Sequence, residues 1–473
     1  MGTARGLLRS GSAATAAQLV RIVALQLTHI VVRRHVPPDE MGIWNWIEPL
    51  FLLLATLRDL GLPAHVLRSR PVALGTLLRV ELVWGALLGL GIVVAAPLVA
   101  LGFREPTPEL VDALRAMSIY LVVEGVAAVV LVGFEGKLRI ERTLAAELLR
   151  TSVYCVVVLA AGIRGLGFWS FVAAQIAAQL VFAAELWRRA RRDRLELEHE
   201  PGSIPRVVRA SLPVGAIGML GIAVTYADSF VVGRLFPRAE LGLYAFAYAY
   251  AFLVTRVLQQ PLGRALYPAF VAFSSAGAEQ FRAYRLGTVL FAALEVPAAF
   301  LLAANAELAT WLLAGREYLG AAPYLALLAF APIVDPLGRF GGELLIARHR
   351  DRARLVSLAL QLAALVGGGV ALSIALGSPF GMAWANFVPI GSLVVLVVLA
   401  RSGEGRELAR LGRQLAEVYL VPVAPFALAI LLAGDRTVPR LVATALAALA
   451  CLSWTWWRHR GEIGSFFGAD EPN

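Results

Sequence analysis

The sequence is short of charged residues and of cysteine. Only 16% of its 473 residues are charged and 59% are hydrophobic, whereas soluble domains have about 25% charged and about 45–50% apolar residues. Apolar runs of about 17–25 residues, enough to cross a bilayer, recur from residue 11 to about 457. Both cysteines, Cys155 and Cys451, fall inside these runs, so no disulfide framework is implied. The chain is therefore predicted to be an all-α polytopic membrane protein.

Two motifs of pumps and enzymes are also missing. The sequence has no Gly-x-x-x-x-Gly-Lys-[Ser/Thr] phosphate loop, which disfavours direct nucleotide-driven pumping, and no His-Glu-x-x-His metal site. The largest outside loops predicted, 102–114 and 305–320, are too small for the evident active site of a membrane glycosyltransferase or ligase. We therefore predict that the chain is not an enzyme and needs no cofactor or metal.

The arginines show how the chain is expected to lie in the membrane. They account for most of the net charge of +10 and cluster in every second loop, which places both termini in the cytoplasm by the positive-inside rule. This distribution is typical of topology signals and not of a nucleic-acid surface. Fourteen transmembrane helices are predicted, at 11–33, 43–66, 78–101, 115–135, 145–164, 167–187, 210–233, 242–268, 285–304, 321–346, 354–376, 380–400, 416–433 and 438–457.

One motif occurs twice, 200 residues apart. VVRRHVPPDEMGIW (31–44) and VVGRLFPRAELGLY (231–244) agree at six of fourteen positions. Each follows the first helix of a predicted six-helix lobe, so the lobes form a parallel pseudo-two-fold repeat. The motif is expected to form a tight outside turn with Gly42 or Gly242 opening the next helix; direct contact with a substrate is the alternative.

The repeat and a long polar interval divide the chain. The predicted parts are an N-lobe (1–187), a cytoplasmic linker (188–209), a C-lobe (210–400), and a final segment with a further linker, two helices and a cytoplasmic tail (401–473).

Polar and charged residues inside the predicted spans are the candidate functional residues. A charge at the bilayer centre costs about 2.5–3.5 kcal/mol on insertion scales, so several together need a wet cavity or partners. We interpret them as the lining of a cationic central cavity between the two lobes, in which guanidinium groups bind an anionic head group. The candidate substrate-binding residues are Gln18, Arg21, Arg256, Gln259, Gln260, Arg264 and Arg339. The candidate coupling or gating residues are Arg58, Asp59, Glu124, Asp228 and Glu295.

Structural explanations stay open for most of these residues. Arg339 has Asp335 and Glu343 at helical spacing and can form a local salt bridge. Arg256 and Arg264 can form interhelical pairs, as can Glu124 and Glu295. Arg58 and Asp59 are interpreted as gate or interface residues.

Several segments resemble those of a known family. VVRRHVPPDEMGIW followed by RDLGLPAHVLRSR (58–70), YADSFVVGRLFPRAELGLYAFAYAYAF (226–252) with LGRALYPAF (262–270), and LAGREYLGAAPYLALLAFAPIVDPLG (313–338) resemble polysaccharide-biosynthesis flippases. These form the O-antigen and teichoic-acid exporter branch of the multidrug/oligosaccharidyl-lipid/polysaccharide exporter superfamily. The resemblance covers most of the chain.

The resemblance implies a function. It implies alternating access that flips a polyprenyl-diphosphate-linked oligosaccharide from the cytoplasmic to the outer leaflet of a bacterial inner membrane. The expected partners are that lipid-linked oligosaccharide and membrane lipids, with a glycan polymerase and other glycan-assembly proteins as further candidates. Two other readings stay open: a proton- or sodium-coupled antiporter of small solutes or drugs, and a non-transporting subunit of a glycan-assembly complex.

Overall fold

The computed structural model describes most of the chain. The described residues are 18, 20–62, 74–136, 140–195, 204–273, 277–434 and 436–466. Residues 196–203 of the predicted linker and 467–473 of the predicted tail lie outside them. Within these ranges the chain forms helices joined by turns, without a strand, which confirms the all-α prediction.

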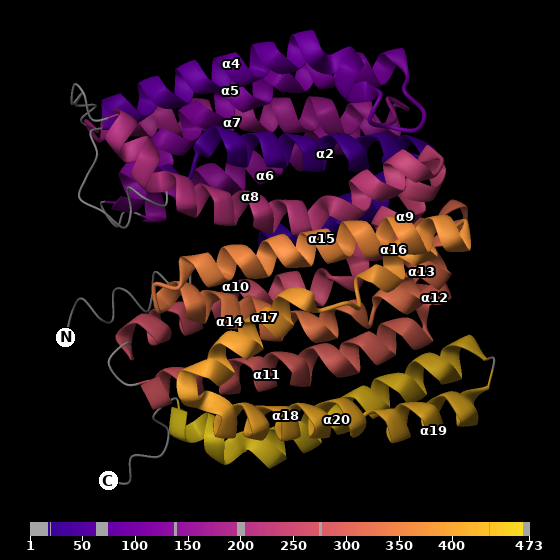
Figure 1. Ribbon diagram of the computed structural model, residues 1–473. Helices are drawn as coiled ribbons and strands as arrows, with labels where there is room; N and C mark the ends of the chain where they lie inside the picture. The colour runs from indigo at the N-terminus through magenta and orange to yellow at the C-terminus, as the bar shows by residue number, and fades with distance from the viewer. Residues whose placement is uncertain are drawn as a thin grey trace. The chain divides into compact units, whose positions relative to one another are not determined.

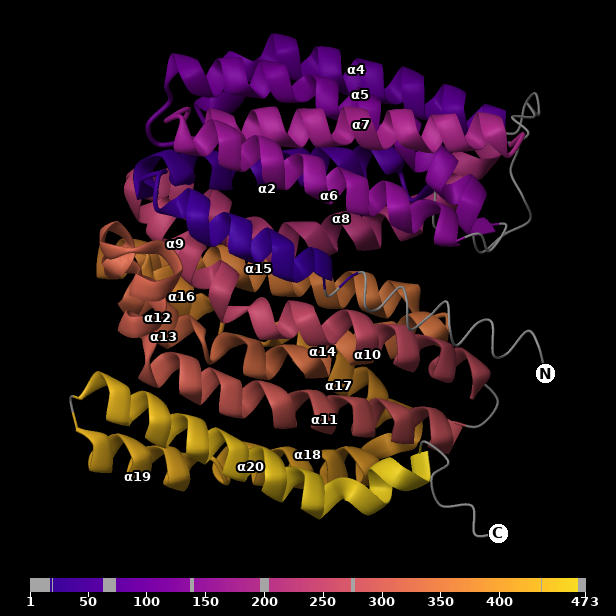
Figure 2. The same cartoon turned by 180° about the vertical axis from the view of Figure 1, so that it is seen from behind.

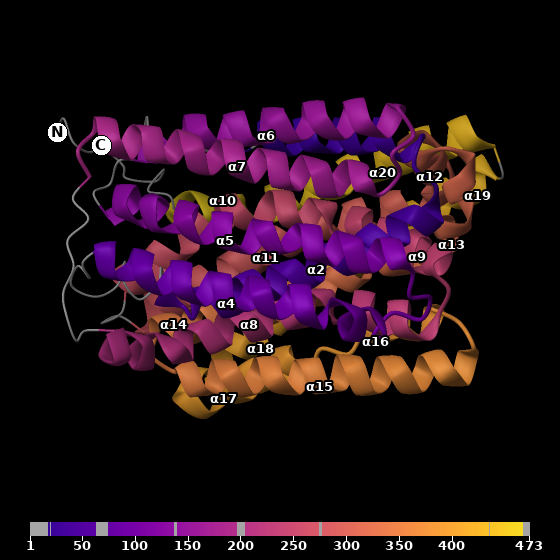
Figure 3. The same ribbon diagram turned by 90° about the horizontal axis from the view of Figure 1, so that it is seen from above.

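The chain forms two compact units, Met1–Gly242 and Leu243–Asn473, and each is described by itself. In the first unit α4 and α5 pack along one another, as do α6 and α7 (Figures 1 and 3). α2 also packs along α8. The helices of this unit are 20–33, α2 (Pro38–Asp59), α4 (Leu74–Ala100), α5 (Pro108–Gly136), α6 (Ile140–Ile163), α7 (Trp169–Arg192), α8 (Ile204–Leu235) and the first residues of α9 (Arg238–Ala251).

Local chemistry explains both ends of α2. Pro38 occupies the first helical turn, where the missing N–H of proline costs nothing. The helix ends at Asp59, because the next residue, Leu60, adopts a left-handed conformation with φ 49°, and Gly61 follows with φ 72°. An added Cβ at Gly61 would collide with the backbone nitrogen of Gly215 in α8. Only glycine therefore allows this end of α2 to lie directly against α8.

The second unit has shorter helices and more breaks. The predicted span 321–346 is divided by a 3₁₀ turn, Ala331–Val334, that contains Pro332. The predicted outside loop 305–320 is largely helical. The remaining elements are α10 (Leu253–Ala272), α11 (Gly277–Ala304), α12 (Ala306–Ala314), a 3₁₀ turn (Arg316–Ala321), α13 (Ala322–Leu328), α14 (Asp335–Ala347), α15 (Asp351–Leu376), α16 (Phe380–Ala385), α17 (Ile390–Leu399), a π-helical turn (Ala400–Glu404), α18 (Gly405–Leu420), α19 (Val423–Ala433) and α20 (Thr437–Phe466).

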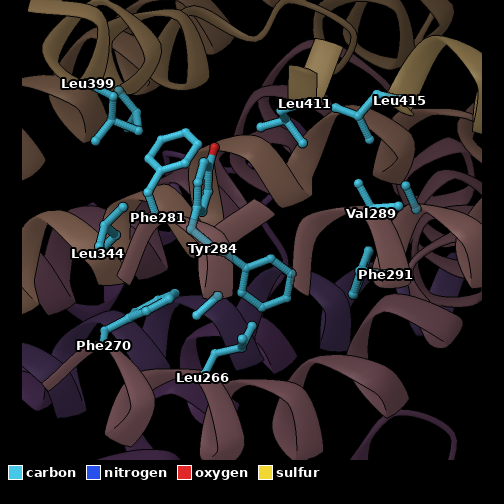
Figure 4. Packing of buried hydrophobic residues seen from close by; sticks show 14 of the residues in the cluster. Leu266, Phe270, Phe281, Tyr284, Val289, Phe291, Leu344, Leu399, Leu411 and Leu415 are labelled. Carbon is cyan, nitrogen blue, oxygen red and sulfur yellow. The ribbon is translucent and has the colours of Figure 1, made fainter. Parts of the chain in front are cut away.

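The core of the second unit is built around α11. Phe281 and Tyr284 pack edge to face with ring centroids 5.3 Å apart, and Figure 4 shows leucines of α10, α14 and α17 around them. Leu411 and Leu415 of α18 complete this buried cluster. α18 is thereby fixed to α11 through one apolar face.

Ten helical stretches among the described residues are long and apolar enough to cross a membrane. This supports the predicted polytopic membrane architecture. The count of fourteen helices and the lobe boundaries at 187 and 400 stay predictions.

Candidate functional site

The two copies of the repeated motif contact one another through their glycines. An added Cβ at Gly42 would collide with the carbonyl oxygen of Arg238, and one at Gly242 with the carbonyl oxygen of Pro38. Because positions 38 and 42 correspond to 238 and 242 in the repeat, the contact is reciprocal. Asp39 and Arg238 add an ion pair of 3.1 Å. α2 and α9 begin at Pro38 and Arg238, so each motif contains a turn that leads into a helix. The prediction that Gly42 and Gly242 open these helices is wrong, because both glycines lie inside the helices.

A buried ion cluster lies where α2, α4 and α5 meet. Arg58 is fully buried, and its Nε donates to Glu81 of α4 at 2.8 Å. Its Nη1 donates to Glu124 of α5 at 2.5 Å and to the carbonyl oxygen of Leu121 at 2.9 Å. Its Nη2 pairs with the adjacent Asp59. Three of the predicted coupling or gating residues, Arg58, Asp59 and Glu124, are therefore in direct contact.

The carboxyl groups of this cluster differ in their exposure to solvent. The side chain of Glu81 is 0% exposed, against 32% for Asp59 and 24% for Glu124. Glu81 Oε1 has no hydrogen-bond partner within the described part of the chain. The cluster therefore combines one sealed carboxyl group with two that are partly accessible.

Two glycines make room for the cluster. An added Cβ at Gly85 would lie 3.3 Å from Arg58 Cδ, and one at Gly125 would lie 3.3 Å from Glu81 Oε2. Both separations are tighter than ordinary contact, so larger residues at either position would press on the ion pair.

The cluster carries more acidic than basic groups. Arg58 stands against three carboxyl groups, and Arg150 of α6 acts electrostatically on Glu124 while it stacks over the ring of Phe182. Tyr120 of α5 is a further titratable neighbour. Burying an unmatched charge is costly, so protonation of a carboxyl group or the approach of a further cation would stabilise the cluster.

Arg21 on the first helix is not isolated. Its guanidinium pairs with Glu147 of α6, Nε donates to Thr151 at 3.2 Å, and Nη1 donates to Gln18 at 3.3 Å. The predicted neighbours Gln18 and Arg21 are thus together, and a phosphate would have to compete with Glu147 for the guanidinium.

The other predicted carboxylates, Asp228 and Glu295, are both buried. Asp228 of α8 accepts the backbone N–H of Ser229 at 2.8 Å, and Glu295 of α11 accepts the hydroxyl of Thr255 at 2.9 Å. They belong to different units. Each lies in a helix long and apolar enough to cross a membrane and is held by a neighbouring hydrogen-bond donor of its own unit.

The basic residues of the second unit divide into exposed and paired groups. Arg256 on α10 is exposed and makes no side-chain hydrogen bond or ion pair with described residues. Arg339 of α14 and Arg354 of α15 both act electrostatically on Glu343, in line with the local salt-bridge explanation for Arg339. The side chains of Gln259, Gln260, Arg264 and Asp335 lie outside the described part of the structure.

Sequence reasoning missed Glu81 and Glu147. Both are carboxylates inside predicted spans, so the cost of burial was a usable signal. Their partners, Arg58 and Arg21, lie 23 and 126 residues away, and helical spacing alone reveals neither pair.

The comparison with protein families decides the family. A family model described as "Polysaccharide biosynthesis protein" matches residues 31–323, a range that includes the Arg58 cluster and both copies of the repeated motif. The chain belongs to this polysaccharide biosynthesis family. No curated protein matches the sequence.

Solved structures show which fold this family member shares. It is similar to the lipid II flippase MurJ in an inward closed conformation, with a TM-score of 0.74 at 10% identity, covering 95% of this chain and 99% of that one. An inward-facing multidrug resistance MATE transporter gives 0.62 at 14% identity, covering 83% and 95%. A mutant of the Vibrio cholerae MATE transporter VcmN gives 0.54 at 15% identity, covering 85% and 99%. The family member therefore has the fold of membrane transporters and flippases.

Proposed function

We propose that the protein is a flippase that moves a polyprenyl-diphosphate-linked oligosaccharide between membrane leaflets. The match to the polysaccharide biosynthesis family carries this proposal. The shared fold with a lipid II flippase supports it. The proposed direction is from the cytoplasmic to the outer leaflet of a bacterial inner membrane, by alternating access, with both termini in the cytoplasm.

Arginine chemistry suits the proposed cargo. A guanidinium group binds two phosphate oxygens at once, and exposed Arg256 has no partner among the described residues. We propose that Arg21, Arg256, Arg264 and Arg339 take part in binding the diphosphate, with Gln18, Gln259 and Gln260 as polar neighbours. The proposed partners are the lipid-linked oligosaccharide, membrane lipids and glycan-assembly proteins such as a polymerase.

The buried carboxyl groups are the proposed coupling and gating residues. The Arg58 cluster has two partly accessible carboxyl groups, Asp59 and Glu124, beside the sealed Glu81. A change in the solvent exposure of these carboxyl groups would change their protonation. Asp228 of α8 and Glu295 of α11 are proposed to act in coupling in the same way.

An ion-coupled antiporter of small solutes or drugs is the second candidate. The similarity to MATE transporters favours it, and it would depend on the buried carboxyl groups more than on Arg21 and Arg256. The two candidates thus differ in which residues bind the cargo.

Binding of a polyprenyl diphosphate separates these candidates. We expect purified protein to bind undecaprenyl diphosphate, with and without an attached sugar, in native mass spectrometry. The Arg21→Ala/Arg256→Ala variant should bind at least tenfold more weakly, because two charge-assisted contacts, each worth about 1.5–3 kcal/mol, are lost.

The matched control is Arg115→Ala/Arg282→Ala, which removes one charge from each unit at ion pairs of 3.5 and 3.8 Å. This control should bind like the wild type. Binding no stronger than that of ordinary anionic lipids would contradict the flippase proposal and favour the antiporter.

A second prediction concerns the competition at Arg21. Glu147→Gln removes the carboxylate that pairs with this arginine, so the diphosphate should bind about two- to fivefold more tightly, as expected for a partly exposed ion pair worth up to about 1 kcal/mol. Titration of the lipid in the same assay measures this. Weaker binding by Glu147→Gln would show that Glu147 positions Arg21 for the cargo and does not compete with it.

A further inference from the structure

The outer surface of α18 carries a stripe of arginine. Arg406, Arg410 and Arg413 are all exposed and follow the i, i+4, i+7 spacing that places side chains on one helical face. The opposite face, with Leu411, Leu415 and Val418, is buried in the core built around α11. The core therefore fixes the direction in which the arginines point.

The glutamates of this segment contact arginines of other elements. Glu404 pairs with Arg348 at 2.5 Å, and Glu407 lies 3.4 Å from Arg285; a third, Glu417, lies 3.5 Å from Arg458 of α20. Together with the three arginines of the stripe, six arginines therefore surround the three glutamates between Ala400 and Leu420. The surface of α18 is net positive.

An apolar surface continues from the stripe. Leu420 is 69% exposed and begins a run of exposed apolar side chains along α19. From Arg413 to Leu420 the helix rises about 10 Å at 1.5 Å per residue. Basic and apolar surfaces therefore follow one another along the same helical stretch, over a distance that a phosphate and the start of its acyl chains can span.

Two tryptophans of α20 lie close to the C-terminal end of α18. α18 and α20 lie along the same edge of the second unit (Figures 1 and 2) and are joined by the Glu417–Arg458 pair. Trp456 and Trp457 directly precede Arg458 and are 61% and 63% exposed. Tryptophan concentrates at the membrane–water interface, which places the arginine stripe at the depth of lipid head groups.

We propose that α18 and the end of α20 form a binding site for an acidic phospholipid. Arg406, Arg410 and Arg413 bind the phosphate-containing head group, and the tryptophans and Leu420 contact the upper acyl chains. The site is separate from the proposed diphosphate-binding residues, and its occupant is a resident membrane lipid and not the cargo. Binding here fixes α18 against the bilayer surface, next to the core around α11.

Tryptophan quenching by brominated lipids tests the proposal. We expect phosphatidylglycerol with brominated chains to quench the purified protein at about a fivefold lower mole fraction than brominated phosphatidylcholine. The difference in signal between the wild type and Trp456→Phe/Trp457→Phe isolates these two tryptophans from the other eight. The triple variant Arg406→Gln/Arg410→Gln/Arg413→Gln should lose the preference for phosphatidylglycerol.

The control removes three exposed arginines elsewhere, as Arg191→Gln/Arg192→Gln/Arg194→Gln at the end of α7, and should retain the preference. Equal quenching of the wild type by both lipids would overturn the proposal. An equal loss of the preference for phosphatidylglycerol in both triple variants would also overturn it. If the α18 variant does not fold, the lipid preference of the wild type is measured at high salt instead, because about 1 M NaCl shortens the screening length to about 3 Å. The preference at Trp456 and Trp457 should then disappear, and its persistence would overturn the proposal. None of these measurements depends on flippase activity.

Discussion

Replacing Arg58 by leucine is expected to destabilise the protein by about 3–5 kcal/mol. The change removes the guanidinium that contacts Asp59, Glu81 and Glu124. Removal of one partner from a buried ion pair leaves an uncompensated charge in a protein interior that solvates it poorly. Denaturant unfolding in mixed micelles measures the loss.

Companion variants show whether the charge imbalance is the cause. Adding Glu81→Gln to Arg58→Leu should restore part of the lost stability, because it removes the carboxylate that is fully sealed. Arg115→Leu, which alters an exposed arginine of α5, should change stability by less than about 0.5 kcal/mol. An Arg58→Leu protein as stable as Arg115→Leu would refute the assignment of the cluster as a structural ion network.

Alanine at either glycine of the repeated motif is the second large expected effect. In Gly42→Ala and in Gly242→Ala the new Cβ collides with a backbone carbonyl oxygen, which cannot move as a flexible side chain can. Overpacking of this kind costs about 1–3 kcal/mol. Melting temperatures of the purified variants should fall, and the double variant should lose less than the sum because the first collision already separates the two motifs.

Gly91→Ala in α4 and Gly221→Ala in α8 are the matched controls. An added Cβ at either position meets no atom within 4 Å, and alanine is favoured over glycine in a helix by about 0.8–1 kcal/mol. These variants should melt at or above the wild-type temperature. If Gly42→Ala melted with them, the reciprocal contact would not exist in the folded protein.

The helices could largely be predicted from the sequence, because apolar runs and proline positions are local signals. The predicted span 210–233 corresponds to α8, Ile204–Leu235, and Pro332 lies at the break between α13 and α14. The turn between α9 and α10 at Phe252 has no such marker, since neither proline nor glycine stands in the surrounding AYAYAFLVTR. Only the packing of the folded chain defines that break.

The candidate residues could be found from the sequence, but their partners could not. A charge within an apolar run is visible without a structure, and this identified Arg58, Glu124 and Arg21. That Arg58 contacts Glu81 and Glu124 together depends on how α2, α4 and α5 pack. Helical periodicity describes one helix at a time, so it cannot identify contacts between helices.

The reciprocal glycine contact also bears on how such a chain can arise. A surface that contacts its own copy through equivalent residues is the interface of a two-fold homodimer, so a gene for one half would have encoded both sides at once. After duplication and fusion, each side can change alone. The Asp39–Arg238 pair shows this divergence, because the equivalent positions hold Ala239 and Pro38 and cannot form an ion pair. The two glycines are the same while the residues around them differ, so the close backbone contact is symmetric and the ion pair beside it is not.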